Sequence, residues 1–131
     1  MIVLDTHVLI WWIGQKERLT RIAHKKIDES AKKKQILVSS ISIWEIYLLV
    51  KRGRLKLTMD VDIWVREIEN ISTIQFIPVD NQIAAKSVTL PGSLHNDPAD
   101  RMIIATAQQE GAVLITADKR IQKYPYVKTV W

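Results

Sequence analysis

Short apolar runs alternate along the chain with longer segments whose apolar residues recur at helical spacing. The runs predict strands at residues 2–4, 35–38, 74–77 and 112–115, with a last strand at 126–131. The segments between them predict helices over residues 6–12, 21–30, 42–52, 81–88 and 98–109. A further helix opens at Asp60 or Asp62 and ends near Asn70, and a short one follows Asp118. This alternation predicts a mostly parallel sheet of about five strands with helices on both faces.

The pattern has clear boundaries but no internal division. Glycines at 14, 53 and 111 end predicted helices, and residues 91–93 form a loop of Pro, Gly and Ser. No repeat, low-complexity tract or linker interrupts the chain. Because 131 residues fit one domain, we expect residues 1–131 to form a single domain.

Two aspartates follow apolar runs that are predicted to be strands. Parallel sheets of this kind bind ligands beyond the carboxyl ends of their strands. Asp5 directly follows the first run, and Asp118 lies three residues after the run that ends at residue 115. We therefore expect both carboxylates to contribute to one site at this edge of the sheet.

Helix capping explains each aspartate equally well when it is taken alone. Asp5 and Asp118 both precede predicted helices. Asp97 stands before Pro98, a favourable start for a helix, and this places Asp100 in the first turn, where a negative charge suits the helix dipole. Position alone therefore leaves capping and chemistry open for every aspartate.

Glu45 is harder to explain as a structural residue. It lies inside a strongly apolar helix, with Ile41, Leu48 and Leu49 on the same face. A carboxylate on such a face points toward the interior, where burial without a partner is costly. Glu45 must therefore pair with a buried base, hold a proton or line a polar site.

Composition limits the chemistry that these acids can perform. The chain has no cysteine, and its histidines are the scattered His7, His24 and His95. Carboxylates that meet at one site repel each other unless a cation neutralises them. Oxygen ligands suit Mg²⁺ or Mn²⁺, whereas zinc prefers Cys and His, so we expect Mg²⁺ or Mn²⁺.

The charge balance points to a polyanionic partner. With 19 basic and 14 acidic residues the net charge is +5, which favours nucleic acid over a membrane surface. No apolar segment is long enough to span a bilayer, and the N-terminal residues lack the basic start of a signal peptide. We expect a cytoplasmic protein with no membrane contact.

Four blocks of sequence resemble the PIN domain family, and more narrowly the VapC-type toxins of bacterial toxin–antitoxin pairs. They are IVLDTHVL at 2–9, SSISIWEI at 39–46, HNDPADRMIIATA at 95–107 and LITAD at 114–118. The blocks occur in the order of the family and cover nearly the whole chain.

The resemblance implies a three-layer α/β/α sandwich and a nuclease site that binds Mg²⁺ or Mn²⁺. By motif, the family's acidic positions match four residues of this sequence: Asp5, Glu45, Asp100 and Asp118. Asp97 is an extra acid in the same loop, a second-choice ligand or a helix cap. Thr6, Ser40 and Thr116 resemble hydroxyl residues that steady those acids.

The implied activity is metal-assisted hydrolysis of RNA by an endoribonuclease toxin. Arg101, Lys119 and Arg120 flank two of the acids and either contact RNA phosphates or remain solvated surface charges. We interpret His7 and His95 as hydrogen-bonding or packing residues.

The resemblance further implies a homodimer and a cognate antitoxin protein that inhibits the site. We expect the apolar helix around Ile46, Leu49 and Val50 to supply a contact surface. Most of the five tryptophans are expected in the core, although aromatic rings can also stack on bases. Of the adjacent Trp11 and Trp12, one should face the core and the other a partner.

Three other functions remain open from the sequence. A non-catalytic nucleic-acid-binding module explains the basic charge but not Glu45. A phosphatase with Asp5 as nucleophile usually needs another Asp two residues on, where this chain has His7. A DNA-directed nuclease of the same fold differs only in substrate.

Overall fold

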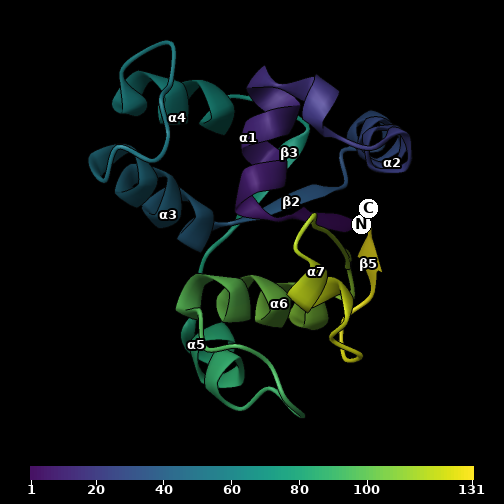
Figure 1. Cartoon of the computed structure of the whole chain (residues 1–131). Helices are drawn as coiled ribbons and strands as arrows, with labels where there is room; N and C mark the ends of the chain where they lie inside the picture. Colours follow the sequence, from purple (N-terminus) through teal and green to yellow (C-terminus); the bar gives the residue numbers. More distant parts are fainter.

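A five-stranded, wholly parallel sheet forms the middle layer of the molecule (Figure 1). The computed structural model describes residues 1–131. The strands are β1 (Ile2–Leu4), β2 (Ile36–Ser39), β3 (Ile74–Ile77), β4 (Val113–Ile115) and β5 (Thr129–Val130), and they lie in the order β3-β2-β1-β4-β5. The predicted parallel sheet of about five strands is confirmed.

Helices cover both faces of this sheet. They are α1 (Thr6–Gly14), α2 (Arg21–Lys32), α3 (Ser40–Lys51), α4 (Val61–Glu69), α5 (Asn81–Val88), α6 (Pro98–Glu110) and α7 (Lys119–Gln122), with a single 3-10 turn, η1 (Lys16–Arg18). Figure 1 shows α1 to α4 on one side of the sheet and α5 to α7 on the other. The three-layer α/β/α arrangement is therefore confirmed.

Side chains that alternate along the strands divide the core into two halves. Ile2 and Leu4 of β1 face the cluster built with α1 to α4, whereas Val3 faces the cluster built with α5 to α7. All three are fully buried. A sheet buried on both faces explains why its strands have continuous apolar runs instead of alternating ones.

The helix starts follow the polar residues that precede them. Thr20 caps α2 by accepting a hydrogen bond from the Ala23 amide, and Asp80 caps α5 through the Ile83 amide. Ser39 caps α3, so this helix begins at Ser40, two residues earlier than expected. Such caps satisfy amide groups that the first helical turn leaves without partners.

The last strand is shorter than predicted. Only Thr129 and Val130 are in strand conformation, and they pair with Leu114 and Ile115 of β4.

The exposed face of α3 differs from the expected one. Ile46 is fully buried in the core, so it cannot belong to a contact surface. Trp44 and Tyr47 are the exposed aromatic residues of this helix. The error arises because α3 is apolar nearly all round, which hides the inner face from a periodicity argument.

The tryptophans are mostly placed as expected. Trp12 and Trp64 are buried, Trp11 and Trp131 are half-buried against the same cluster, and Trp44 is exposed. No helix of the structure is both long enough and apolar enough to cross a membrane.

Candidate metal centre

Carboxylates from three different helix starts and one helix interior line a single pocket at the carboxyl edge of the sheet. This pocket has a volume of about 330 Å³. Its lining includes five acids, Asp5, Glu45, Asp97, Asp100 and Asp118, together with His7, Trp11, Ala117 and Arg120. The fold thus gathers residues that are more than a hundred positions apart in the sequence.

Asp5 lies at the end of β1 and is 7% exposed. Its amide donates to the Ile115 carbonyl of β4 at 3.0 Å, which continues the sheet by one residue. Its Oδ1 accepts from the Thr6 amide at 2.8 Å and caps α1, while its Oδ2 accepts from the Thr116 hydroxyl at 2.7 Å. Burial raises the pKa of Asp5 although both hydrogen bonds favour its ionised form.

Glu45 projects from α3 without a compensating cation. Its Oε1 is buried and has no hydrogen-bond partner. No Lys, Arg or His forms an ion pair with it, so the alternative of a buried base is not realised. Burial raises the pKa of Glu45, and the nearby charges of Asp5 and Asp97 raise it further.

Asp100 is the acid whose titration the site alters most clearly. Its side chain is 13% exposed, and its Oδ2 lies 2.7 Å from Nε2 of His95. Burial, together with the charges of Asp5, Asp97 and Glu45, raises the pKa of Asp100 to about 6 even though the His95 hydrogen bond lowers it. The hydrogen bond from His95 thus holds Asp100 in place.

Asp97 and Asp118 act as helix caps and also line the pocket. Asp97 Oδ1 accepts from the Asp100 amide at 2.9 Å at the start of α6. Asp118 Oδ1 accepts from the Arg120 amide at 2.8 Å at the start of α7. The two interpretations that the sequence left open are therefore compatible.

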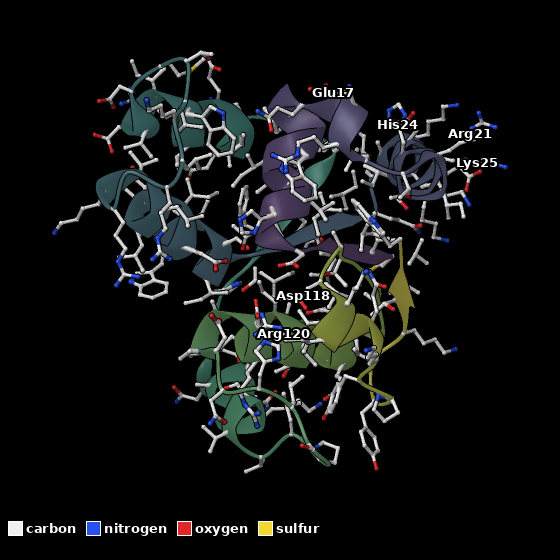
Figure 2. All side chains as sticks on the ribbon, viewed as in Figure 1. Glu17, Arg21, His24, Lys25, Asp118 and Arg120 are labelled. Carbon is white, nitrogen blue, oxygen red and sulfur yellow. The ribbon has the colours of Figure 1, made fainter.

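Arg120 is the one guanidinium among these acids. It lies 2.9 Å from Asp118 Oδ2 and 3.9 Å from Asp100 Oδ2 (Figure 2). This hydrogen-bonded pair lowers the pKa of Asp118. The Arg120 side chain is 63% exposed, so it can leave the carboxylates at little cost.

The donor geometry fits a hard divalent cation. Glu45, Asp97 and Asp100 offer oxygens that lie within 4.8 Å of one another. The ligand atoms of His95, Asp100 and Asp118, one ring nitrogen and two oxygens, are equally close together. The orphaned Glu45 oxygen is a second observation in favour, because a buried charge requires a partner. Carboxylate oxygens are the ligands that Mg²⁺ and Mn²⁺ prefer.

The supporting hydroxyls are only partly where the sequence placed them. Thr116 contacts Asp5, and Thr6 donates to Ser42 Oγ at 2.9 Å beside it. Ser40 does not hydrogen-bond to an acid: its hydroxyl accepts from the Val79 amide at 3.0 Å. This prediction is wrong because α3 begins at Ser40, and it is Ser42 that faces Thr6.

The three residues predicted to contact phosphate have different surroundings in the structure. Arg101 donates to the carbonyls of Ser87, Leu94 and His95, and so fastens the loop before α6. It is not free to bind phosphate as predicted. Lys119 is exposed and does not line the pocket, whereas Arg120 does.

Sequence reasoning undervalued two residues of the pocket. His95 orients Asp100, and Trp11 forms part of the wall. The signal for His95 was its place in the loop directly before α6, since such a loop returns toward the helix start. The part that Trp11 plays in the wall depends on a pocket completed by residues far away in the sequence, such as Asp100 and Asp118.

Fold and site together define an α/β protein with an acidic pocket at the carboxyl edge of a parallel sheet. The chain belongs to the PIN domain family, whose model matches residues 2–126.

Relatives and solved structures agree with this assignment. The chain is 35% identical to Ribonuclease VapC22 of Mycobacterium tuberculosis over 133 residues, which covers 99% of this chain and 98% of the relative. A toxin–antitoxin complex from Klebsiella pneumoniae contains a chain with 26% identity and a TM-score of 0.67, covering 100% of this chain and 97% of the other. FitAcB from Neisseria gonorrhoeae is similar in fold, with 20% identity, a TM-score of 0.71 and coverage of 100% and 97%.

Proposed function

We propose that this protein is a metal-dependent endoribonuclease and the toxin of a toxin–antitoxin pair. The observation that carries the proposal is the convergence of buried, incompletely neutralised carboxylates on one pocket. The similarity to Ribonuclease VapC22 supports RNA as the substrate.

Asp5, Glu45, Asp100 and Asp118 are the proposed ligands of Mg²⁺ or Mn²⁺, with Asp97 as an additional ligand. When bound, such a cation supplies Lewis-acid chemistry, which polarises the phosphodiester and activates water. The fit rests on the short separations among ligand atoms of Glu45, Asp97 and Asp100, on those of Asp118 with Asp100 and His95, and on the unpaired oxygen of Glu45. Asp5 is included because it lines the same pocket.

The chain's own residues prepare the site for this chemistry. Thr116 and the Thr6 amide each occupy one side of the Asp5 carboxylate and leave further lone pairs on both oxygens. His95 fixes Asp100 in the same way. Arg120 neutralises Asp118 before substrate arrives and, being exposed, can turn to an RNA phosphate afterwards.

The partners are proposed on the similarity to known complexes. The Klebsiella pneumoniae structure is a toxin–antitoxin complex, which supports a protein antitoxin for this chain. A homodimer and a cytoplasmic location are further parts of the proposal.

A cleavage assay tests the proposed activity. Purified protein is incubated with mixed single-stranded RNA and Mg²⁺ or Mn²⁺, beside samples with EDTA and beside Asp100→Asn. We expect cleavage only in the metal-containing wild type. Cleavage that persists in both controls would contradict the mechanism, because a contaminant or another site would then be responsible.

The same assay separates the alternatives. Binding of RNA without any cleavage indicates a non-catalytic module, and preferential cleavage of DNA indicates a DNA-directed nuclease. A covalent phosphoryl group on Asp5 would indicate a phosphatase.

A further inference from the structure

A second polar pocket adjoins the acidic one and has the opposite charge. It has a volume of about 410 Å³ and lies between α1, η1, the end of α3 and the segment that follows α3. Its polar lining includes Arg18, Arg54 and Lys56, and it shares His7 and Trp11 with the acidic pocket. We call it the basic pocket.

The cations of the basic pocket have no acidic partner. No Asp or Glu lines the pocket, and none of Arg18, Arg54 and Lys56 forms an ion pair. All three side chains are exposed. Three unneutralised positive charges around one concave surface attract an anion, because their electrostatic potentials add up inside the pocket.

Local structure holds these cations in place. Leu55 and Leu57 pack against the core, so the alternating Arg54 and Lys56 project outward. On the opposite wall, the Arg18 guanidinium lies over the Trp11 ring, 4.7 Å from its centre, a cation–π contact that favours this position of the side chain. A guanidinium held in this way loses less side-chain entropy when it binds phosphate.

The acidic pocket creates a need for such a surface. Five carboxylates repel a polyanionic substrate, and one or two divalent cations neutralise only part of that charge. The strand must therefore be held by positive charge outside the acidic pocket. Arg54 also lines a third pocket together with Glu45 and Asp97, so the basic pocket and the acids are connected from a second side.

We propose that the basic pocket binds the RNA strand beside the scissile phosphate. Arg18, Arg54 and Lys56 bind neighbouring backbone phosphates, and a base packs against His7 and Trp11. This inference rests on the proposed ribonuclease function. An acidic protein segment is the less favoured occupant, since aromatic rings beside cations suit a strand that carries both bases and phosphates.

Fluorescence anisotropy with a short, fluorescein-labelled oligouridylate tests the proposal. The measurements use Asp5→Asn in Mg²⁺, so that the probe stays intact and the cap of α1 is kept by Asn. The variant Arg54→Ala/Lys56→Ala is compared with Arg21→Ala/Lys25→Ala. The second variant removes the same charge from α2, where Arg21 and Lys25 are labelled at the right of Figure 2. The two variants therefore differ in the place of the lost charge and not in its amount.

We expect Arg54→Ala/Lys56→Ala to weaken binding roughly tenfold near 0.1 M salt and to flatten the slope of log K against log salt by about 1.4, the loss of two contacts to a single strand. The α2 variant should change both quantities little. In the cleavage-competent protein the pocket variant should raise KM and leave kcat nearly unchanged, because these residues do not touch the reacting atoms.

Three results would overturn the inference. Equal weakening by both variants indicates general surface charge, and unchanged RNA binding indicates that the pocket is not on the RNA path. Reduced binding of labelled polyglutamate with unchanged RNA binding assigns the pocket to an acidic protein segment. Failure of the proposed function is distinguishable, because it appears as absent cleavage by the wild type.

Discussion

Five helices of this molecule begin at an aspartate, and these caps fall into two groups. Asp60 and Asp80 cap α4 and α5 and are exposed. Asp5, Asp97 and Asp118 cap α1, α6 and α7 with the same kind of hydrogen bond, yet all three line the acidic pocket. The local structure is alike in both groups, and only the tertiary surroundings differ.

The comparison shows that capping and chemistry are not competing explanations. A cap uses one carboxylate oxygen to accept a backbone amide and leaves the other oxygen available. At Asp80 that second oxygen faces solvent, whereas at Asp5 it accepts a hydrogen bond from Thr116 in a pocket lined by four other acids. Repulsion among such acids is relieved by a cation, which is how a structural residue becomes a metal ligand.

The largest expected difference between the groups is in RNA cleavage. Asp5→Asn and Asp80→Asn both keep a good capping residue, so each removes only a charge. We expect Asp5→Asn to lower kcat at least about 100-fold with Mg²⁺ or Mn²⁺, since a proposed ligand is lost, and Asp80→Asn to change it less than about twofold. Initial rates on a labelled RNA measure both. Similar rates for the two variants would contradict the proposed centre.

Metal binding should stabilise the protein through the pocket acids alone. At a cation concentration about 100 times Kd, the free energy of unfolding should rise by about 2.7 kcal/mol, which thermal unfolding detects as a higher Tm. Glu45→Gln should abolish most of this rise, because it removes the oxygen that has no other partner. Glu67→Gln on the exposed side of α4 is the matched control and should retain the rise. A full rise in Glu45→Gln would mean that the cation binds elsewhere.

Without metal, the pocket acids should lower stability at neutral pH. The pKa of Asp100 is raised from 3.8 to about 6, so the folded protein holds a proton that the unfolded chain releases between these values. Stability contributed by this proton is complete below the unfolded pKa and is lost as the pH rises through about 6. Asp100→Asn should therefore stabilise the EDTA-treated protein by about 2 kcal/mol at neutral pH.

Urea unfolding from pH 4 to 7.5 in EDTA measures this effect. The free energy of unfolding of the wild type should fall more steeply with pH than that of Asp100→Asn, and the two should converge at the acidic end. With an excess of Mn²⁺ at neutral pH the wild type should be more stable than Asp100→Asn, because the cation requires the carboxylate. Equal pH slopes for both proteins would contradict a raised pKa at this residue.

Local signals predicted most of the fold. The strand at 74–77 and the helix at 81–88 agree with the structure residue for residue, because an apolar run and the Asp80 cap define them. The start of α3 was misplaced by two residues, since Ser39, Ser40 and Ser42 are all acceptable near a helix start. The resemblance likewise suggested Ser40 as a support for the acids, whereas its hydroxyl accepts from the Val79 amide.

Long-range contacts account for the rest. The four carboxylates were identified from their motifs, and the structure brings them into one pocket. Thr116 was expected beside an acid, whereas the contact of His95 with Asp100 was not. Arg101 binds carbonyls of a loop that folds back on α6, a contact that no spacing reveals. Ile46 and Tyr47 are adjacent on an apolar helix, and only the position of the sheet decides which is buried.

The smallest expected difference lies between two caps that are truncated in the same way. Asp80→Ala should lower the free energy of unfolding by about 1 kcal/mol, because the Ile83 amide loses its acceptor. Asp97→Ala removes an equivalent hydrogen bond to the Asp100 amide, but it also removes a negative charge that raises the pKa of both Glu45 and Asp100. The two effects oppose each other, so in EDTA we expect a loss of less than about half of that at Asp80. In urea unfolding with Mn²⁺ in excess, the loss at Asp97 should rise to at least that at Asp80, since the cation removes the repulsion that offsets the lost cap. Equal losses at both positions in EDTA would mean that Asp97 is a cap and nothing more.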